Sequence, residues 1–74
     1  MYQIGDVLRG PRTGDLYVLI NKSKASDVVR LRKVWVNPAC SGRRVTQVGD
    51  TTTPSLYAMH RMTLVGRNYQ EKAK

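Results

Sequence analysis

Short apolar runs separated by turn residues dominate the pattern of this chain. Val and Leu gather in Asp6–Arg9, Leu16–Ile20 and Asp27–Val36, and the segments between these runs hold Gly, Pro, Asn and Ser. Closely spaced runs of this length are typical of β-strands joined by turns, in which Pro fixes φ and Gly supplies positive φ. The pattern therefore predicts a small, mainly β domain.

The second run is the most apolar of the three, because it reads LYVLI from Leu16 to Ile20. A strand without polar positions is expected to be covered on both faces. We therefore expect this segment to be the central strand of a sheet.

The third run, Asp27–Val36, does not alternate cleanly between apolar and polar residues. Strict alternation would put Lys33 and Trp35 on the apolar face. Either a β-bulge near Arg32–Lys33 shifts the later residues to the other face, or the strand crosses from the core to the sheet edge. We favour the bulge, which directs four apolar side chains inward: Val29, Leu31, Val34 and Val36. It leaves three side chains outward or at the rim: Arg30, Lys33 and Trp35.

The remaining elements are shorter. Thr and Val in Arg43–Val48 favour a fourth strand that forms a hairpin with the third, and a loop follows over Gly49–Ser55. Thr53 followed by Pro54 predicts a helix start, with one or two helical turns over Ser55–Met62. Its expected core-facing residues are Leu56, Met59 and Met62.

A last short strand is expected over Met62–Val65, with one domain over residues 1–66 and a disordered basic tail over residues 67–74. Four to five strands with one helical turn before the last strand predict a small SH3-like barrel or a bent antiparallel sheet. The opening IGDVLRG, Ile4–Gly10, resembles the first strand of many such barrels.

The chain has 74 residues, which is enough for one domain. It has one cysteine, Cys40, so no disulfide forms within the chain. Its first residues lack the basic and apolar regions of a signal peptide, and no apolar run approaches the length that spans a bilayer. These features predict a soluble protein of a reducing cytoplasm with no membrane partner. We also expect the protein to be a monomer.

The charge is strongly positive and unevenly placed. The net charge is +8, and seven of the thirteen Lys and Arg residues lie between positions 22 and 44, against the single acid Asp27. Such a field attracts polyanions and speeds encounter with acidic surfaces. Trp35 lies within this basic stretch, either as a core or rim residue or as an exposed contact for a base or a protein. The predicted partner-binding residues are Lys22, Lys24, Arg30, Arg32, Lys33, Trp35, Arg43 and Arg44.

The sequence offers no enzymatic or cofactor signature. His60 and Cys40 have no partner at metal-ligand spacing, and none of the glycines forms a phosphate-binding loop. The presence of Ser55, His60 and Asp50 does not identify a catalytic triad, since triads are recognised by their geometry rather than by residue type. We therefore expect a binding protein without metal or cofactor.

The whole chain, from MYQIGDVLRGPRTGDLYVLI to YAMHRMTLVGRN, resembles small phage-encoded regulators of host bacterial RNA polymerase in overall sequence and size. The resemblance implies a non-enzymatic protein that binds the large polymerase subunits. It also implies inhibition of initiation by weakened sigma-factor engagement, antitermination near the RNA exit path, or both, in the host cytoplasm. No binding residue is carried over from it. The alternative is a free-standing small β-barrel that binds RNA or DNA.

Overall fold

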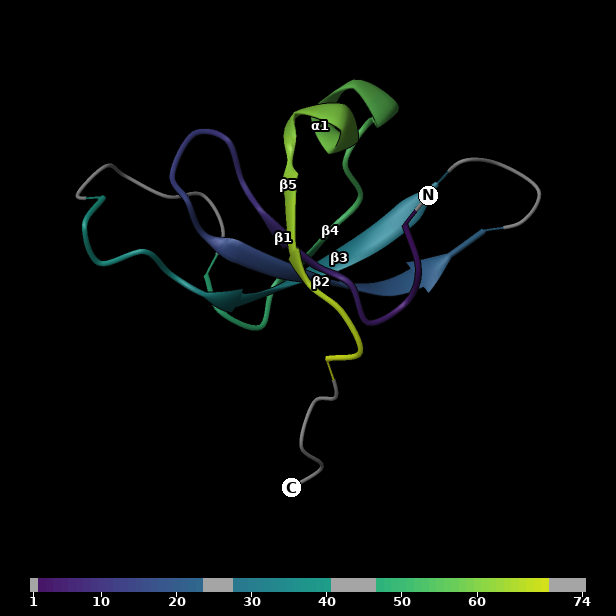
Figure 1. The fold of residues 1–74 in the computed structure, drawn as a ribbon, viewed down its shortest axis with the longest axis horizontal. Helices are drawn as coiled ribbons and strands as arrows, with labels where there is room; N and C mark the ends of the chain where they lie inside the picture. Colours follow the sequence, from purple (N-terminus) through teal and green to yellow (C-terminus); the bar gives the residue numbers. More distant parts are fainter. Residues whose placement is uncertain (1, 24–27, 41–46, 70–74) are drawn as a thin grey trace.

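Five antiparallel strands form a single sheet in the computed structural model, which describes residues 2–23, 28–40 and 47–69 (Figure 1). The sheet order is β4-β3-β2-β1-β5, and a short helix precedes the last strand. The elements are β1 (Val7–Arg9), β2 (Leu16–Lys22), β3 (Val29–Trp35), β4 (Thr51–Thr52), α1 (Leu56–Arg61) and β5 (Thr63–Gly66). The predicted mainly β fold with one helical turn before the last strand is confirmed.

The prediction that the second strand is central is also confirmed. β2 lies between β1 and β3, and its Val18 and Leu19 are both buried although adjacent side chains of a strand point to opposite faces. Figure 1 shows β5 running across the direction of β2 and β3, so the sheet is strongly bent, with β4 and β5 at its two edges.

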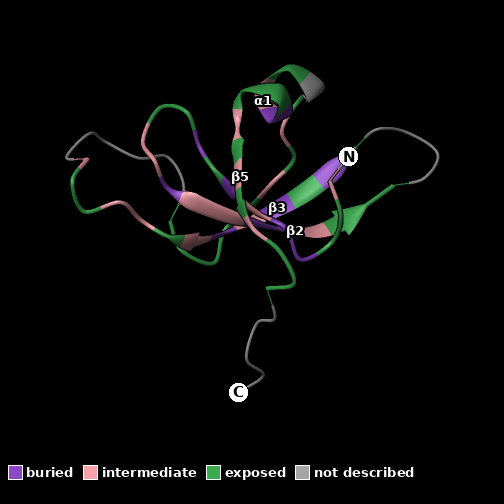
Figure 2. Ribbon diagram, viewed as in Figure 1, coloured by how far each residue is buried: buried purple, intermediate pink, exposed green. Residues whose placement is uncertain are grey.

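The hydrophobic core lies between the sheet and α1. It consists of five buried residues from three strands and the helix: Leu8, Leu19, Val29, Leu31 and Met59. Figure 2 shows the buried positions along the strands and on the side of α1 that faces them. Met62 and Leu64 pack against this cluster, so Met59 and Met62 face the core as predicted. The face of the sheet that carries this core is called the inner face below.

The helix begins later than the sequence predicts. Its N-cap is Ser55, whose Oγ accepts a hydrogen bond from the backbone N–H of Ala58 at 3.2 Å. Thr53 and Pro54 instead form the connection from β4, because Thr52 is still paired with Leu31 of β3. The prediction of a Thr53 cap with Pro54 in the first helical turn is therefore wrong by two residues.

The strand that pairs with β3 along its edge away from β2 is also different from the predicted one. It is β4, which falls inside the segment predicted to be a loop. Gln47 and Val48 are not in a strand, and positions 43–46 of the predicted fourth strand lie outside the described residues. Asp50 closes a tight turn instead, since its Oδ2 accepts the Gln47 N–H at 2.9 Å, and Lys33 N donates to its carbonyl at 3.0 Å.

The chain continues in contact with the domain after β5. Gly66 lies within β5, and Tyr69 N donates a hydrogen bond to the carbonyl of Gly5 at 2.9 Å. Positions 70–74 of the predicted tail lie outside the described residues.

The predicted bulge in the third strand is present, one residue later than expected. Tyr17 pairs with Lys33 and Leu16 pairs with Trp35, so Val34 is the extra residue. Lys33 therefore stays on the inner face, and Trp35 turns to the opposite face, where it is 44% exposed. The outward position of Trp35 is confirmed, and that of Lys33 is wrong. Two of the residues predicted to point inward, Val34 and Val36, are half-buried rather than buried.

Candidate binding surface

Three arginines and a tryptophan share the face of the sheet that lies opposite the core. Val18 pairs with Arg32, and Leu16 pairs with both Arg9 and Trp35. Directly opposed residues in antiparallel strands point to the same side, and Arg30 lies two residues from Arg32 on β3. These relations define the basic outer face, which consists of Arg9, Arg30, Arg32 and Trp35.

The spacing of these side chains follows from sheet geometry. Arg30 and Arg32 start roughly 7 Å apart along β3, and Arg9 and Trp35 start roughly 10 Å apart across Leu16. Arg9 and Arg30 are exposed, and neither forms an ion pair with another of the described residues. The guanidinium groups of Arg9 and Arg30 are therefore held on one face of the sheet without a described ion-pair partner, where they can meet anionic groups of a larger molecule.

Apolar residues lie among these cations. Val18 is buried although it does not belong to the core cluster, and its cross-strand neighbours Val7 and Arg32 are half-buried. Val18 is therefore shielded from solvent on the outer face, where its cross-strand neighbours are Val7 and Arg32. A surface that combines apolar groups, arginine and an exposed tryptophan has the composition of protein-binding contact centres.

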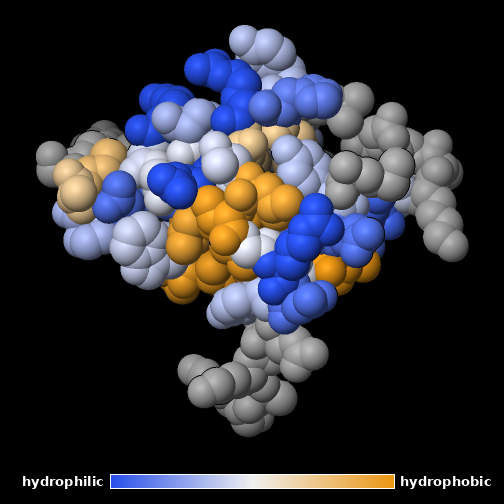
Figure 3. Space-filling view, in the orientation of Figure 1, coloured by the Kyte–Doolittle hydropathy of each residue, from blue (hydrophilic) through white to orange (hydrophobic). Residues whose placement is uncertain are grey.

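A second apolar area lies where the last strand joins the sheet. Figure 3 shows hydrophobic groups near the middle of the face in view, over the crossing of β1, β2 and β5, with hydrophilic groups around them. Val65 is the extra residue between the Val7–Gly66 and Leu8–Leu64 pairs, and it is 42% exposed. The bulge at Val65 thus turns an apolar side chain towards solvent at the β5 edge.

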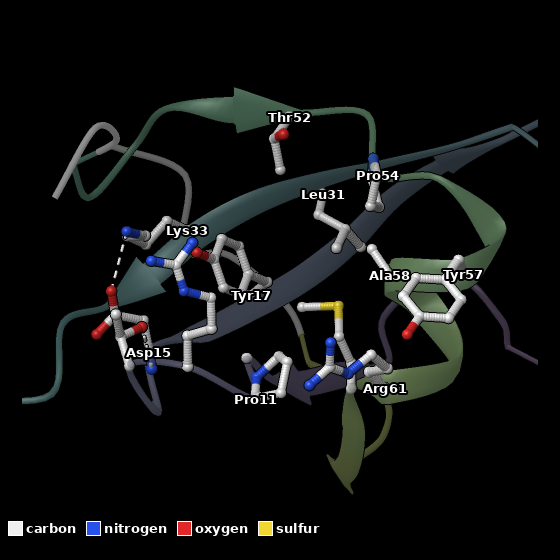
Figure 4. Close-up of a pocket in the computed structure, with 14 residues that line it drawn as sticks. Pro11, Asp15, Tyr17, Leu31, Lys33, Thr52, Pro54, Tyr57, Ala58 and Arg61 are labelled. Carbon is white, nitrogen blue, oxygen red and sulfur yellow. Dashed lines mark hydrogen bonds and ion pairs between the residues drawn. The ribbon is translucent and has the colours of Figure 1, made fainter.

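Lys33 is separated from the basic outer face by the sheet itself. Its side chain is 2% exposed, and its Nζ lies 2.9 Å from Oδ2 of Asp15, which is fully buried (Figure 4). The ammonium also lies 5.4 Å from the centre of the Tyr17 ring. Oδ1 of Asp15 accepts the Asn37 N–H at 2.8 Å. Burial of a lysine is tolerated here because its charge is paired and hydrogen-bonded.

The other predicted contact residues are also apart from the basic outer face. Lys22 pairs with Val29 of the inner face, and its Nζ donates to the carbonyl of Tyr2 at 2.9 Å. Lys24, Arg43 and Arg44 lie outside the described residues. The structure thus brings together Arg30, Arg32 and Trp35 from the predicted set.

Arg9 is the member that the sequence analysis missed. The N-terminal third of the chain looks neutral, since it holds two arginines and two aspartates. Both aspartates are buried, however, and Asp6 and Asp15 each accept a backbone N–H, from Gln3 and Asn37 respectively. Their negative charges therefore lie in the interior, whereas the positive charge of Arg9 lies at the surface.

Within residues 2–23, 28–40 and 47–69, no three metal-ligating side chains gather, and no helix is long and apolar enough to cross a membrane. Ser55 uses its hydroxyl to cap α1. Comparison of the chain with protein-family models, with curated proteins and with solved structures found no match.

Proposed function

We propose that this protein is a non-enzymatic regulator of transcription that binds bacterial RNA polymerase through its basic outer face. The observation that supports the proposal is the placement of Arg9, Arg30 and Arg32 beside the exposed Trp35 on one face of the sheet. The choice of polymerase as the partner, and of a phage as the source, comes from the resemblance described above.

The physical basis of this binding is electrostatic attraction combined with one aromatic contact. Arginines on a rigid sheet attract acidic protein surfaces and speed association. An exposed tryptophan supplies a large apolar contact at low cost in side-chain entropy, and residues of this type often dominate interface energies. A small domain with this surface acts by occupying a site on the larger enzyme, either blocking initiation or altering the elongating complex.

A second candidate function is direct binding of RNA or DNA, with the protein acting alone. The observation that favours it is the same row of arginines, since guanidinium groups on neighbouring strands can follow a phosphate backbone. One aromatic residue on this face is fewer than the two or three that stack bases on most RNA-binding sheets. The polymerase proposal is therefore preferred.

An affinity pull-down from bacterial lysate, with and without nuclease, separates the two candidates. The polymerase proposal predicts that the large polymerase subunits are recovered in equal amounts under both conditions. Recovery of nucleic acid without polymerase, or loss of polymerase after nuclease treatment, would support the nucleic-acid alternative. Transcription with purified polymerase then distinguishes inhibited promoter initiation from increased readthrough at a terminator.

A further inference from the structure

A groove of about 460 Å³ lies on the side of the sheet opposite the basic outer face (Figure 4). Its floor is formed by Tyr17 and Leu31 of the inner face, and Pro11 and Pro54 stand on its two sides. α1 closes one end of the groove, and the buried Asp15–Lys33 pair lies at the other end. This volume is in the range of sites that hold a small ligand or a few side chains.

The rim of the groove carries positive charge that no described carboxylate neutralises. Arg12 and Arg61 line the groove, both are exposed, and neither forms an ion pair with another of the residues that the structure describes. Among the described residues that line the groove, Asp15 is the only acid, and its two oxygens already contact Lys33 Nζ and Asn37 N. The groove therefore favours a ligand with negative charge.

The aromatic rings of the groove are already faced by cations. The Tyr17 ring has Lys33 Nζ at 5.4 Å from its centre, and the Tyr57 ring has Arg61 Cζ at 5.8 Å. A nucleic-acid base would have to displace Arg61 in order to stack on this face of Tyr57. A carboxylate can bind the Arg61 guanidinium without disturbing it. This arrangement favours an acidic peptide over a nucleic acid.

The apolar part of the groove sets the second requirement for the ligand. Ala58 and Met62, both half-buried, line it without offering any side-chain hydrogen-bond group. An aliphatic or aromatic side chain gains by burial against them, at about 25 cal/mol per Å² of apolar surface removed from water. A bare anion such as phosphate would leave this surface unused.

We propose that the groove binds a short acidic peptide segment of a partner protein. Carboxylates of the segment pair with Arg12 and Arg61, and an apolar side chain packs on Ala58 and Met62. This inference is independent of the proposed polymerase function, because it concerns the opposite face of the sheet and a different set of residues.

Selection of random 12-residue peptides on the immobilised protein tests the proposal. The selected consensus peptide is synthesised, together with a copy in which lysine replaces each acidic residue, and a 12-nucleotide single-stranded RNA is the competing probe. Binding is measured by fluorescence anisotropy and mapped by backbone amide chemical shifts in NMR. The variant Arg12→Glu with Arg61→Glu is compared with Lys22→Glu plus Arg67→Glu, two exposed cations outside both surfaces whose replacement changes the net charge by the same amount. Thermal unfolding confirms that both variants are folded.

The proposal predicts an acidic consensus with apolar residues and shifts at residues lining the groove. It also predicts affinity reduced at least about tenfold in the Arg12 and Arg61 variant, and changed less than about twofold in the control. Failure to enrich acidic peptides, shifts confined to the basic outer face, or equal loss in both variants would overturn it. Preferential binding of the RNA to the groove would overturn it in favour of a nucleic-acid site.

Discussion

Lys33 and Asp15 form the interaction on which the local structure of the groove end depends. Both side chains are almost completely buried and lie 2.9 Å apart, and Asp15 also holds the Asn37 N–H. Such a pair adds little net stability over an apolar pair, but removal of one partner leaves a buried charge without compensation. Asp15 therefore ties the loop between β1 and β2 to β3 through Lys33 and to the segment after β3 through Asn37.

Lys33→Met is expected to lower the free energy of unfolding by about 3–5 kcal/mol, because the Asp15 carboxylate stays buried without its counter-charge. Adding Asp15→Asn removes that charge and retains an oxygen for the Asn37 N–H, so the double variant is expected to be more stable than Lys33→Met alone. Urea denaturation followed by circular dichroism measures both. A double variant that is less stable than the single one would show that the charge pair does not explain the burial.

The inward position of Lys33 could not be predicted from the sequence. A lysine next to an arginine in a strand is expected to point outward, and its acidic partner lies in a loop eighteen positions earlier. The bulge was predicted from the broken alternation, but its position at Val34 depends on which side chain finds a partner inside. That choice is a tertiary interaction, and local pattern does not contain it.

At the scale of elements, hydrophobic pattern located the longer strands and missed the shortest one. β1 and β3 fall within the apolar runs, and β2 covers its run Leu16–Ile20 and continues to Lys22. β2 is central as its composition indicates. β4 has only two residues, Thr51 and Thr52, and is held by pairing with β3 rather than by any pattern of its own. Arg9 was missed in the predicted contact surface for a similar reason. It joins the basic outer face only through the pairing of β1 with β2, which the local sequence pattern does not show.

The start of α1 gives a direct test at this scale. Ser55→Ala removes the hydroxyl that accepts the Ala58 N–H and is expected to cost about 1 kcal/mol of stability. Thr53→Ala is the matched control, because Thr53 lies in the connection from β4, and its expected cost is less than about 0.5 kcal/mol. Chemical denaturation of the two variants measures the difference. A larger cost at Thr53 would place the cap where the sequence alone predicts it.

At the scale of the whole molecule, acidic and basic side chains occupy different places in the fold. The two buried aspartates act inside the fold, and the arginines of β1 and β3 remain at the surface opposite the core. The inner face carries the core and the groove, and the outer face carries the arginines and Trp35. A protein of this size can therefore present two distinct surfaces on one sheet.

Binding through the basic outer face is expected to weaken as salt concentration rises, because exposed charges separated by more than about 8 Å are largely screened at physiological ionic strength. Association rates should fall more steeply than dissociation rates rise, since electrostatic attraction acts mainly on encounter. Surface plasmon resonance on immobilised polymerase at several salt concentrations measures both rates. Affinity that does not change with salt concentration would contradict electrostatic binding through the basic outer face.

The most direct test of the account is the affinity of three single variants for purified bacterial RNA polymerase. Arg9→Glu and Arg30→Glu change the basic outer face on two different strands, and Arg67→Glu changes an exposed arginine beyond β5 by the same charge. The account predicts that each of the first two weakens binding by at least about tenfold, or about 1.4 kcal/mol, and that the third changes it by less than about twofold. Equal affinities for all three variants and the unmodified protein would contradict it.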